Sequence, residues 1–323
     1  MPVLLKNVRQ IIMNTHAATL MPSQMREPSR VAIRRVGNYQ AELIAPMVET
    51  LREFNLPIRG KTILLKPNFV GPDPLNLVNT HPAVVAAARE SFLQLGAERV
   101  LLGDGPALDR DTEGIAESMH LGDYVGPLAR CLVDLNSDVP RKTLLHTNAS
   151  TLKYLYFPET VIGADLVVSM PRMKTHHWAG VTLSLKNMFG VVPGNCYGWP
   201  KNILHWAGIT RSLLDINATV RPDFAIVDGI IGMEGNGPTQ GTAKPCGVLV
   251  MGDDPVAVDA TCTRIMGLVP EQVEYLAQAA ILLGNLREEK ISQIGETIGQ
   301  VLTPFEVLEN FKKLQQGATT NGN

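Results

Sequence analysis

Short apolar runs alternate with segments of helical spacing, and this rhythm constrains the fold more than any other feature. Strands are expected at 30–36, 61–66 and 98–104, with helices at 41–54 and 82–96 between them. A strand, a helix and a second strand in succession favour parallel pairing with helices on the sheet faces. The sequence therefore predicts an α/β fold whose mostly parallel sheet is flanked by helices.

The rest of the chain continues this pattern less regularly. We expect a single α/β domain over 29–316, with two closely joined lobes that divide near 110–165, between an N-terminal arm (1–28) and a disordered tail (317–323). Further strands are predicted within 131–158 and at 164–170, 223–229 and 247–253, and further helices at 110–119, 202–219, 255–266 and 271–283. The Gly- and Pro-bearing segments 171–200 and 230–245 are predicted to be loops.

Composition excludes several classes of function. The 323 residues are 45% hydrophobic and 19% charged, and the net charge of -2 argues against a nucleic-acid binder, which would carry a basic patch. No apolar run reaches the roughly 18 residues of a membrane helix, and the N-terminus shows no signal-peptide cleavage pattern. We therefore expect a cytoplasmic protein without membrane partners. The composition is compatible with a homo-oligomer but specifies none.

The cofactor motifs that a sequence can reveal are missing. The four cysteines, at 131, 196, 246 and 262, are far apart and form no C-x-x-C pair, so no zinc or iron–sulfur site is encoded locally. The Gly-rich segment 230–242 matches neither the phosphate-loop pattern nor the dinucleotide fingerprint. The sequence thus gives no nucleotide motif, and the cofactor, if any, is unknown.

Polar residues follow the predicted strands where each of them ends. In open α/β sheets, ligands bind in the crevice outside the carboxyl ends of the strands. The strand ends that carry such residues hold Lys66 with Asn68, Asp104, Lys174, Asp228 and the Asp253–Asp254 pair. Each of two residues also has a purely structural explanation: Asp104 could form part of a turn, and Lys66 could extend from the sheet edge into water. Five such ends together predict a ligand site.

Segment 171–195 is the richest in candidate site residues. It contains Arg172, Lys174, His176, His177, Lys186 and Asn187 among small and apolar residues. Clustered cations fit an anionic substrate, and a lysine in an apolar setting has a lowered pKa and acts as a base. The structural alternative is a solvated basic loop. Adjacent histidines on a strand point in opposite directions, so we prefer His176 to His177 as a site residue.

Other candidates depend on single residues. His81 precedes Pro82 at a predicted helix start, where histidine is a poor cap, so its ring is expected to serve a ligand, a metal or a proton. Glu234 lies among glycines that include Gly235 and Gly237, whose segment suits a lid, an amide cradle for an anion, or a plain connection. Asp259 lies in an apolar helix and needs a partner, for which we expect a site lysine.

Three longer stretches resemble a known family. They are KPNF with THPAVVAAARESFLQLGAERVLLGDGP, SMPRMKTHHWAGVTLSLKNMFGVVPG, and VDGIIGMEGNGPTQGTAKPCGVLVMGDDPVAVDA. In this order, over about 60–270, they resemble the domain of unknown function 362 family. The resemblance implies no settled activity. Many members carry a ferredoxin-like cysteine module that this chain lacks, and the family is distantly similar to the nickel-pincer lactate racemases, which implies a two-lobed α/β architecture with His and Lys in a cleft.

The first hypothesis is an enzyme that acts on a small anionic substrate, bearing carboxylate or phosphate, by acid/base chemistry. Isomerase or racemase and hydrolase classes stay open, as does a divalent metal held by Asp104, Asp228 and Glu234. The alternatives are an iron–sulfur or cofactor-associated redox accessory protein and a non-catalytic ligand-binding protein. The predicted catalytic residues are His81, His176, Lys174, Lys186 and Asp104, and the predicted substrate-binding residues are Lys66, Asn68, Asn187, Gly235 and Gly237.

Overall fold

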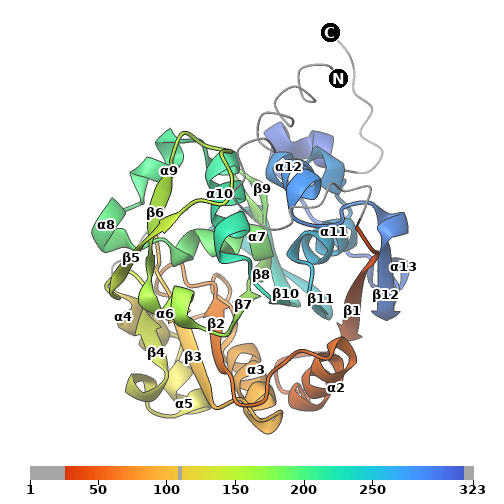
Figure 1. The fold of residues 1–323 in the computed structure, drawn as a ribbon. Helices are drawn as coiled ribbons and strands as arrows, with labels where there is room; N and C mark the ends of the chain where they lie inside the picture. Colours follow the sequence, from red (N-terminus) through yellow and green to blue (C-terminus); the bar gives the residue numbers. More distant parts are fainter. Residues whose placement is uncertain (1–25, 108–110, 316–323) are drawn as a thin grey trace.

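The computed structural model describes residues 26–107 and 111–315, so most of the predicted arm and all of the predicted tail lie outside the described residues. One large sheet runs through the molecule (Figure 1). Its strands lie in the order β12 (Ile291–Gly295), β1 (Ser29–Arg35), β11 (Gln240–Gly252), β10 (Phe224–Asn236), β7 (Leu166–Met170), β2 (Thr62–Pro67), β3 (Arg99–Asp104) and β4 (Leu132–Asp134).

The predicted parallel pairing is confirmed for most of this sheet. Strands β10, β7, β2, β3 and β4 run parallel to one another, and β1 and β12 form a second parallel pair at the other edge. Strand β11 is antiparallel to both β10 and β1. The carboxyl end of β11 therefore lies beside the amino ends of the parallel strands, away from Lys66 and Asp104. The prediction that Asp253 and Asp254 join these residues is wrong.

Helices cover both faces of the sheet, as predicted. Alternate residues of β2 point to opposite faces, so Ile63 and Leu65 join one core while Leu64 joins the other. The first core packs beneath α2 (Ile44–Phe54), α3 (Pro82–Gln94), α4 (Thr112–Ser118) and α5 (Leu121–Val125). The second packs beneath α10 (Ile209–Val220), α11 (Pro255–Ile265) and α12 (Glu274–Leu282), on the other side in Figure 1.

The middle of the chain adds a small separate sheet. Strands β5 (Pro140–Leu144) and β6 (Tyr154–Pro158) form an antiparallel pair, followed by α6 (Glu159–Gly163). Shorter elements elsewhere include η2 (Leu128–Arg130), α9 (Asn202–Trp206), η4 (Pro270–Gln272), η5 (Glu288–Lys290), α13 (Ile298–Val301) and η6 (Glu309–Leu314). Within the described part of the chain, no helix has the length and apolar character needed to cross a membrane.

Two segments predicted as loops are ordered elements instead. Segment 171–200 contains β8 (Arg172–His176), β9 (Gly180–Thr182), α7 (Ser184–Asn187), η3 (Met188–Val191) and α8 (Gly194–Tyr197). Segment 230–245 belongs to the long hairpin of β10 and β11. Gly232 allows close packing within its strand, because a Cβ there would lie 2.7 Å from the Phe305 ring.

Candidate functional site

A pocket of about 200 Å³ opens where β2, β3 and β8 end and α7 begins. Parallel strands deliver their carboxyl ends to the same edge, which explains why residues distant in sequence meet here. Of the residues predicted from sequence, this pocket brings together Lys66, Asn68, Asp104, Lys174, His176, Lys186 and Asn187. The remaining predicted site residues lie elsewhere or behind the pocket wall.

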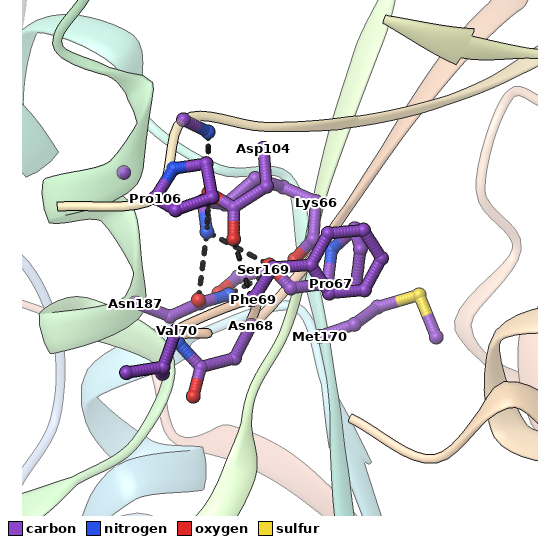
Figure 2. Close-up of polar contacts among 12 residues, drawn as sticks. Lys66, Pro67, Asn68, Phe69, Val70, Asp104, Pro106, Ser169, Met170 and Asn187 are labelled. Carbon is purple, nitrogen blue, oxygen red and sulfur yellow. Dashed lines mark hydrogen bonds and ion pairs between the residues drawn. The ribbon is translucent and has the colours of Figure 1, made fainter. Parts of the chain in front are cut away.

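Lys66 and Asp104 form a buried ion pair at the base of the pocket (Figure 2). Lys66 Nζ lies 2.6 Å from Asp104 Oδ1 and donates to Pro67 O and Asn187 Oδ1, both at 2.8 Å. The Asp104 carboxylate also accepts from the backbone N–H groups of Phe69 and Gly105. All three ammonium protons of Lys66 are engaged, so this pair is a framework for the pocket and has little capacity left for a ligand.

Asn187 ties this framework to its neighbours. Its Nδ2 donates to Lys66 O at 2.9 Å and to Ser169 Oγ at 3.1 Å, while its Oδ1 accepts from the Lys66 ammonium. The side chain thus links β2, β7 and α7. Asn187 was predicted to bind substrate, but its amide is occupied by protein groups and holds the pocket together.

Lys174 is fully buried on β8 and has one hydrogen-bond partner among the described residues. Its Nζ donates to Val78 O at 2.9 Å, and the Val78 N–H in turn is bound by the Asp73 carboxylate. Burial, followed by the nearby charges of Arg172 and Lys186, lowers the pKa of Lys174 to about 7. The side chain is therefore poised to gain or lose a proton near neutral pH.

Lys186 presents an amino group to the pocket from α7. Within the described residues it makes no ion pair and no hydrogen bond, and its Nζ lies 4.6 Å from the centroid of the Phe189 ring. Burial, followed by the charge of Lys66, lowers the pKa of Lys186 to about 8. An unpaired ammonium group in a pocket attracts an anion.

Asp259 fixes the start of the helix that carries Lys186. Its two carboxylate oxygens accept from Ser184 N at 2.7 Å and from Leu185 N at 2.9 Å, and the side chain is fully buried. Burial raises the pKa of Asp259 to about 8, although both amides favour the carboxylate. The expectation that Asp259 pairs with a site lysine is therefore wrong, because backbone amides are its partners.

His176 lines the pocket as a neutral imidazole. Its Nδ1 accepts from Trp178 N at 3.0 Å and Ala179 N at 3.3 Å, which assigns the ring proton to Nε2. Burial, with the charge of Lys186 next, lowers the pKa of His176 to about 2. The ring of His177 stacks on it with centroids 4.9 Å apart and also lines the pocket. The two rings do not point in opposite directions, because His177 lies in the turn after β8.

His81 and Asp228 lie outside the pocket, against each other. The His81 ring caps α3, since its Nδ1 accepts from Ala83 N at 3.1 Å, and it stacks on Tyr39 with centroids 3.6 Å apart. Asp228 accepts from His81 N and Tyr39 Oη, and its Oδ2 lies 3.4 Å from Arg172 Nη1. Burial lowers the pKa of His81 to about 4. Histidine thus acts as a helix cap here despite its low preference for that position.

The three carboxylates predicted to hold a metal do not converge. Asp104 pairs with Lys66, Asp228 with Arg172, and Glu234 with Lys244 at 3.0 Å. Among residues 26–107 and 111–315, no three His, Cys, Asp or Glu side chains gather into a metal-binding group.

The cysteines are also spread over the fold. Cys131 and Cys262 are buried, Cys246 is half-buried and Cys196 is exposed, each on a different segment. This dispersion within one chain does not support the redox alternative.

Gly235 and Gly237, predicted to bind substrate, lie outside the pocket lining. Gly235 N donates to Glu306 O, and Gly237 O accepts from both the backbone N–H and Nδ1 of His177. Gly237 thereby holds His177 against the pocket, while Gly235 faces the C-terminal segment. The contacts of the two residues are with protein groups, and neither lines the pocket.

Sequence analysis missed Thr182, which lines the pocket, and Lys201, which does not line it but bonds to Gly105 in its wall. Lys201 is fully buried and donates to Gly105 O at 2.6 Å, and burial lowers its pKa to about 7. Thr182 lines the pocket from β9. Thr182 lies within segment 171–195, but a neutral threonine there has none of the charge that drew attention to its neighbours, and Lys201 follows no predicted strand end.

Comparisons with known proteins assign the chain to a family. A thylakoid-associated protein of Synechocystis sp. is 30% identical over 259 residues, which is 76% of this chain and 77% of that protein. Because that relative is thylakoid-associated, the cytoplasmic location expected from the sequence stays a prediction.

Two solved structures have weak similarity to this chain. The lactate racemase apoprotein from Thermoanaerobacterium thermosaccharolyticum has 13% identity and a TM-score of 0.46, and a Thermotoga maritima protein has 8% and 0.37. The alignments cover 77% and 68% of this chain but only 59% and 57% of those proteins. The sequence itself gives the assignment: residues 63–264 match the family described as Domain of unknown function (DUF362), and the chain belongs to that family.

Proposed function

We propose that this protein is an enzyme that binds a small anion bearing carboxylate or phosphate and moves a proton on it. The observation that carries the proposal is the unpaired amino group of Lys186, which opens into the pocket beside Lys174. Among the described residues that line the pocket, Asp104 is the only carboxylate, and Lys66 already neutralises it. The pocket therefore has an excess of positive charge that an anionic ligand would balance.

Lys174 and Lys186 can occupy different protonation states within one site. Lys174 and Lys186 have pKa values lowered to about 7 and about 8, mainly by burial, so near neutral pH one can be an ammonium and the other an amine. The ammonium would hold the anion, and the amine would act as the general base. A base with a pKa close to the working pH combines a sufficient free-amine population with adequate basicity.

The sequence predicts that His176 transfers a proton. In this proposal it is a hydrogen-bond donor instead. With its pKa lowered to about 2 by burial and nearby lysines, the ring stays neutral. Because Nδ1 accepts from two backbone amides, Nε2–H is the group available as a donor. It would stabilise negative charge that develops on the substrate without transferring a proton itself.

Of the two reaction classes, isomerisation or racemisation is better supported than metal-assisted hydrolysis. A lysine amine would take the proton from a carbon next to the carboxylate, the electron pair would move into the carboxylate system, and a lysine ammonium would return a proton. These proton-transfer steps need only the two lysine amino groups and the hydrogen-bond donor in the pocket. The hydrolytic alternative needs Asp104, Asp228 and Glu234 at one metal site. Each of these carboxylates instead pairs with a different basic side chain.

Solvent deuterium exchange tests the proposal. The protein is incubated in D₂O with malate, aspartate, alanine and glycerate, and the loss of the C–H signal next to the carboxylate is followed by proton NMR. We expect exchange with at least one acid, its loss in Lys174→Met and Lys186→Met, and its retention in the exposed control Lys142→Met. Exchange that persists in both lysine variants contradicts the assignment. Anion binding without exchange would favour the non-catalytic ligand-binding alternative.

A further inference from the structure

Two buried polar atoms in the pocket have no partner within the described structure. They are Oγ1 of Thr182 and Oδ1 of Asn68, and both residues line the pocket. Thr182 is only 4% exposed. A buried polar atom without a hydrogen bond is costly, and such atoms at a pocket point to the group that a ligand supplies.

The fold fixes the positions of both residues beside the pocket. Thr182 on β9 lies directly opposite Lys174 on β8, so their side chains share one face of the strand pair. Asn68 N donates to Thr80 Oγ1 at 2.8 Å, and Thr80 N donates to Asn68 O at 3.0 Å. These bonds fix the Asn68 backbone directly after β2, and in Figure 2 its side chain lies apart from the Lys66 network.

The chemistry of the two atoms differs from that of the rest of the site. The amino groups of Lys174 and Lys186 and the Nε2–H of His176 are donors, which an anion satisfies by itself. Asn68 Oδ1 is an acceptor and gains nothing from an anion. The Thr182 hydroxyl can both donate and accept. The pocket thus combines donors for an anion with an acceptor for a second group of the ligand.

Building on the anion site proposed above, we infer that the pocket selects an anion carrying a hydroxyl or amino group, with Asn68 as the acceptor for that group. Thr182 is the second polar partner, next to Lys174. Both are specificity residues in this assignment, because they read the substituent and leave the anion itself to the lysines. A matched anion without the substituent would leave Asn68 Oδ1 buried and unpaired, which is the strongest basis for discrimination between similar ligands.

Calorimetric titration of malate and succinate, which differ by one hydroxyl group, tests the inference. We expect wild-type protein to bind malate at least about tenfold more tightly than succinate. Asn68→Leu should reduce malate affinity to the level of succinate and leave succinate affinity unchanged. Thr182→Val, which keeps side-chain shape, should also reduce the preference, and it carries the test if Asn68→Leu does not fold. The exposed Lys142→Met variant is the control and should behave as wild type.

The outcomes separate this inference from the proposed function. Equal affinity of wild-type protein for malate and succinate, with both lost in Lys186→Met, overturns the selectivity and leaves the anion site intact. Equal losses for both ligands in Asn68→Leu and in Thr182→Val also overturn it, because the side chains would then support the pocket in general. Absence of binding for both anions overturns the anion site and the selectivity together.

Discussion

Lys66 Nζ and Asp104 Oδ1 lie 2.6 Å apart beneath the pocket, with each side chain only 1% exposed. Removing one partner of such a pair leaves the other as an uncompensated charge in a medium of low polarity. The remaining bonds of Lys66, to Pro67 O and Asn187 Oδ1, come from two different elements. This pair therefore links the stability of the fold to the shape of the pocket.

Lys66→Met should destabilise the protein strongly. We expect a loss of about 3–5 kcal/mol in the free energy of unfolding, because Asp104 would be buried without its cation. Urea unfolding followed by circular dichroism measures the effect. The double variant Lys66→Met with Asp104→Asn should recover part of the loss, since it removes both charges. A single variant as stable as wild type would show that the pair contributes nothing to the fold.

Lys186→Met should have the opposite profile. No ion pair or hydrogen bond to described residues is lost, and an unpaired charge in a pocket is replaced by an apolar side chain of similar length. We expect a melting temperature equal to or higher than that of wild type, together with at least about a tenfold loss of succinate affinity. Thermal denaturation and calorimetric titration measure the two effects. A large fall in melting temperature would instead make Lys186 a structural residue.

Much of the fold follows from the sequence because its signals are local. Apolar runs of strand length separated by helical periods predict β2, β3 and β7 together with their helices. The strand-end rule then places Lys66, Asn68 and Asp104 at one site, since β2 and β3 are parallel neighbours. The rule fails for Asp253 and Asp254 because the direction of β11 depends on its pairing with β10 and β1, which no local pattern specifies.

The partners of the site residues were harder to predict than the residues themselves. The density of cations in segment 171–195 identifies Lys174, His176 and Lys186 correctly as pocket residues. Nothing in their spacing shows that Lys66, and not one of them, pairs with Asp104. The roles of His81, Asp228 and Asp259 were misjudged for the same reason, since each is set by contacts with residues far along the chain.

Asp259→Ala should weaken both the fold and the anion site. The substitution leaves the amides of Ser184 and Leu185 without acceptors in a buried region, which costs about 1–3 kcal/mol for each unsatisfied group. Because these amides begin α7, Lys186 should lose its fixed position and succinate affinity should fall. Chemical unfolding and titration are the measurements, with the exposed carboxylate variant Glu49→Ala as the control. Unchanged succinate affinity in a folded variant would contradict the positioning role.

Anion affinity should fall as the pH rises through the lowered pKa values of the pocket lysines. Lys174 and Lys186, with pKa values of about 7 and about 8, are mostly protonated at about pH 6 and mostly neutral at about pH 9. Binding of succinate should therefore weaken across this interval. Calorimetric titration at several pH values measures the dependence, and Lys186→Met should show a shallower one. A wild-type affinity that is constant with pH would contradict the role of the lysines.

The stability of the fold should depend on pH in the opposite direction. The pKa of Lys186 is lowered from 10.5 to about 8 in the folded state, so between these values the unfolded chain binds more protons than the folded one. The free energy of unfolding of wild type, relative to Lys186→Met, should thus increase as the pH rises from about 8 toward about 10.5. Urea unfolding of both proteins across this range measures the difference. A difference that stays constant would mean that Lys186 keeps its ordinary pKa in the fold, and its proposed part in proton transfer near neutral pH would fail with it.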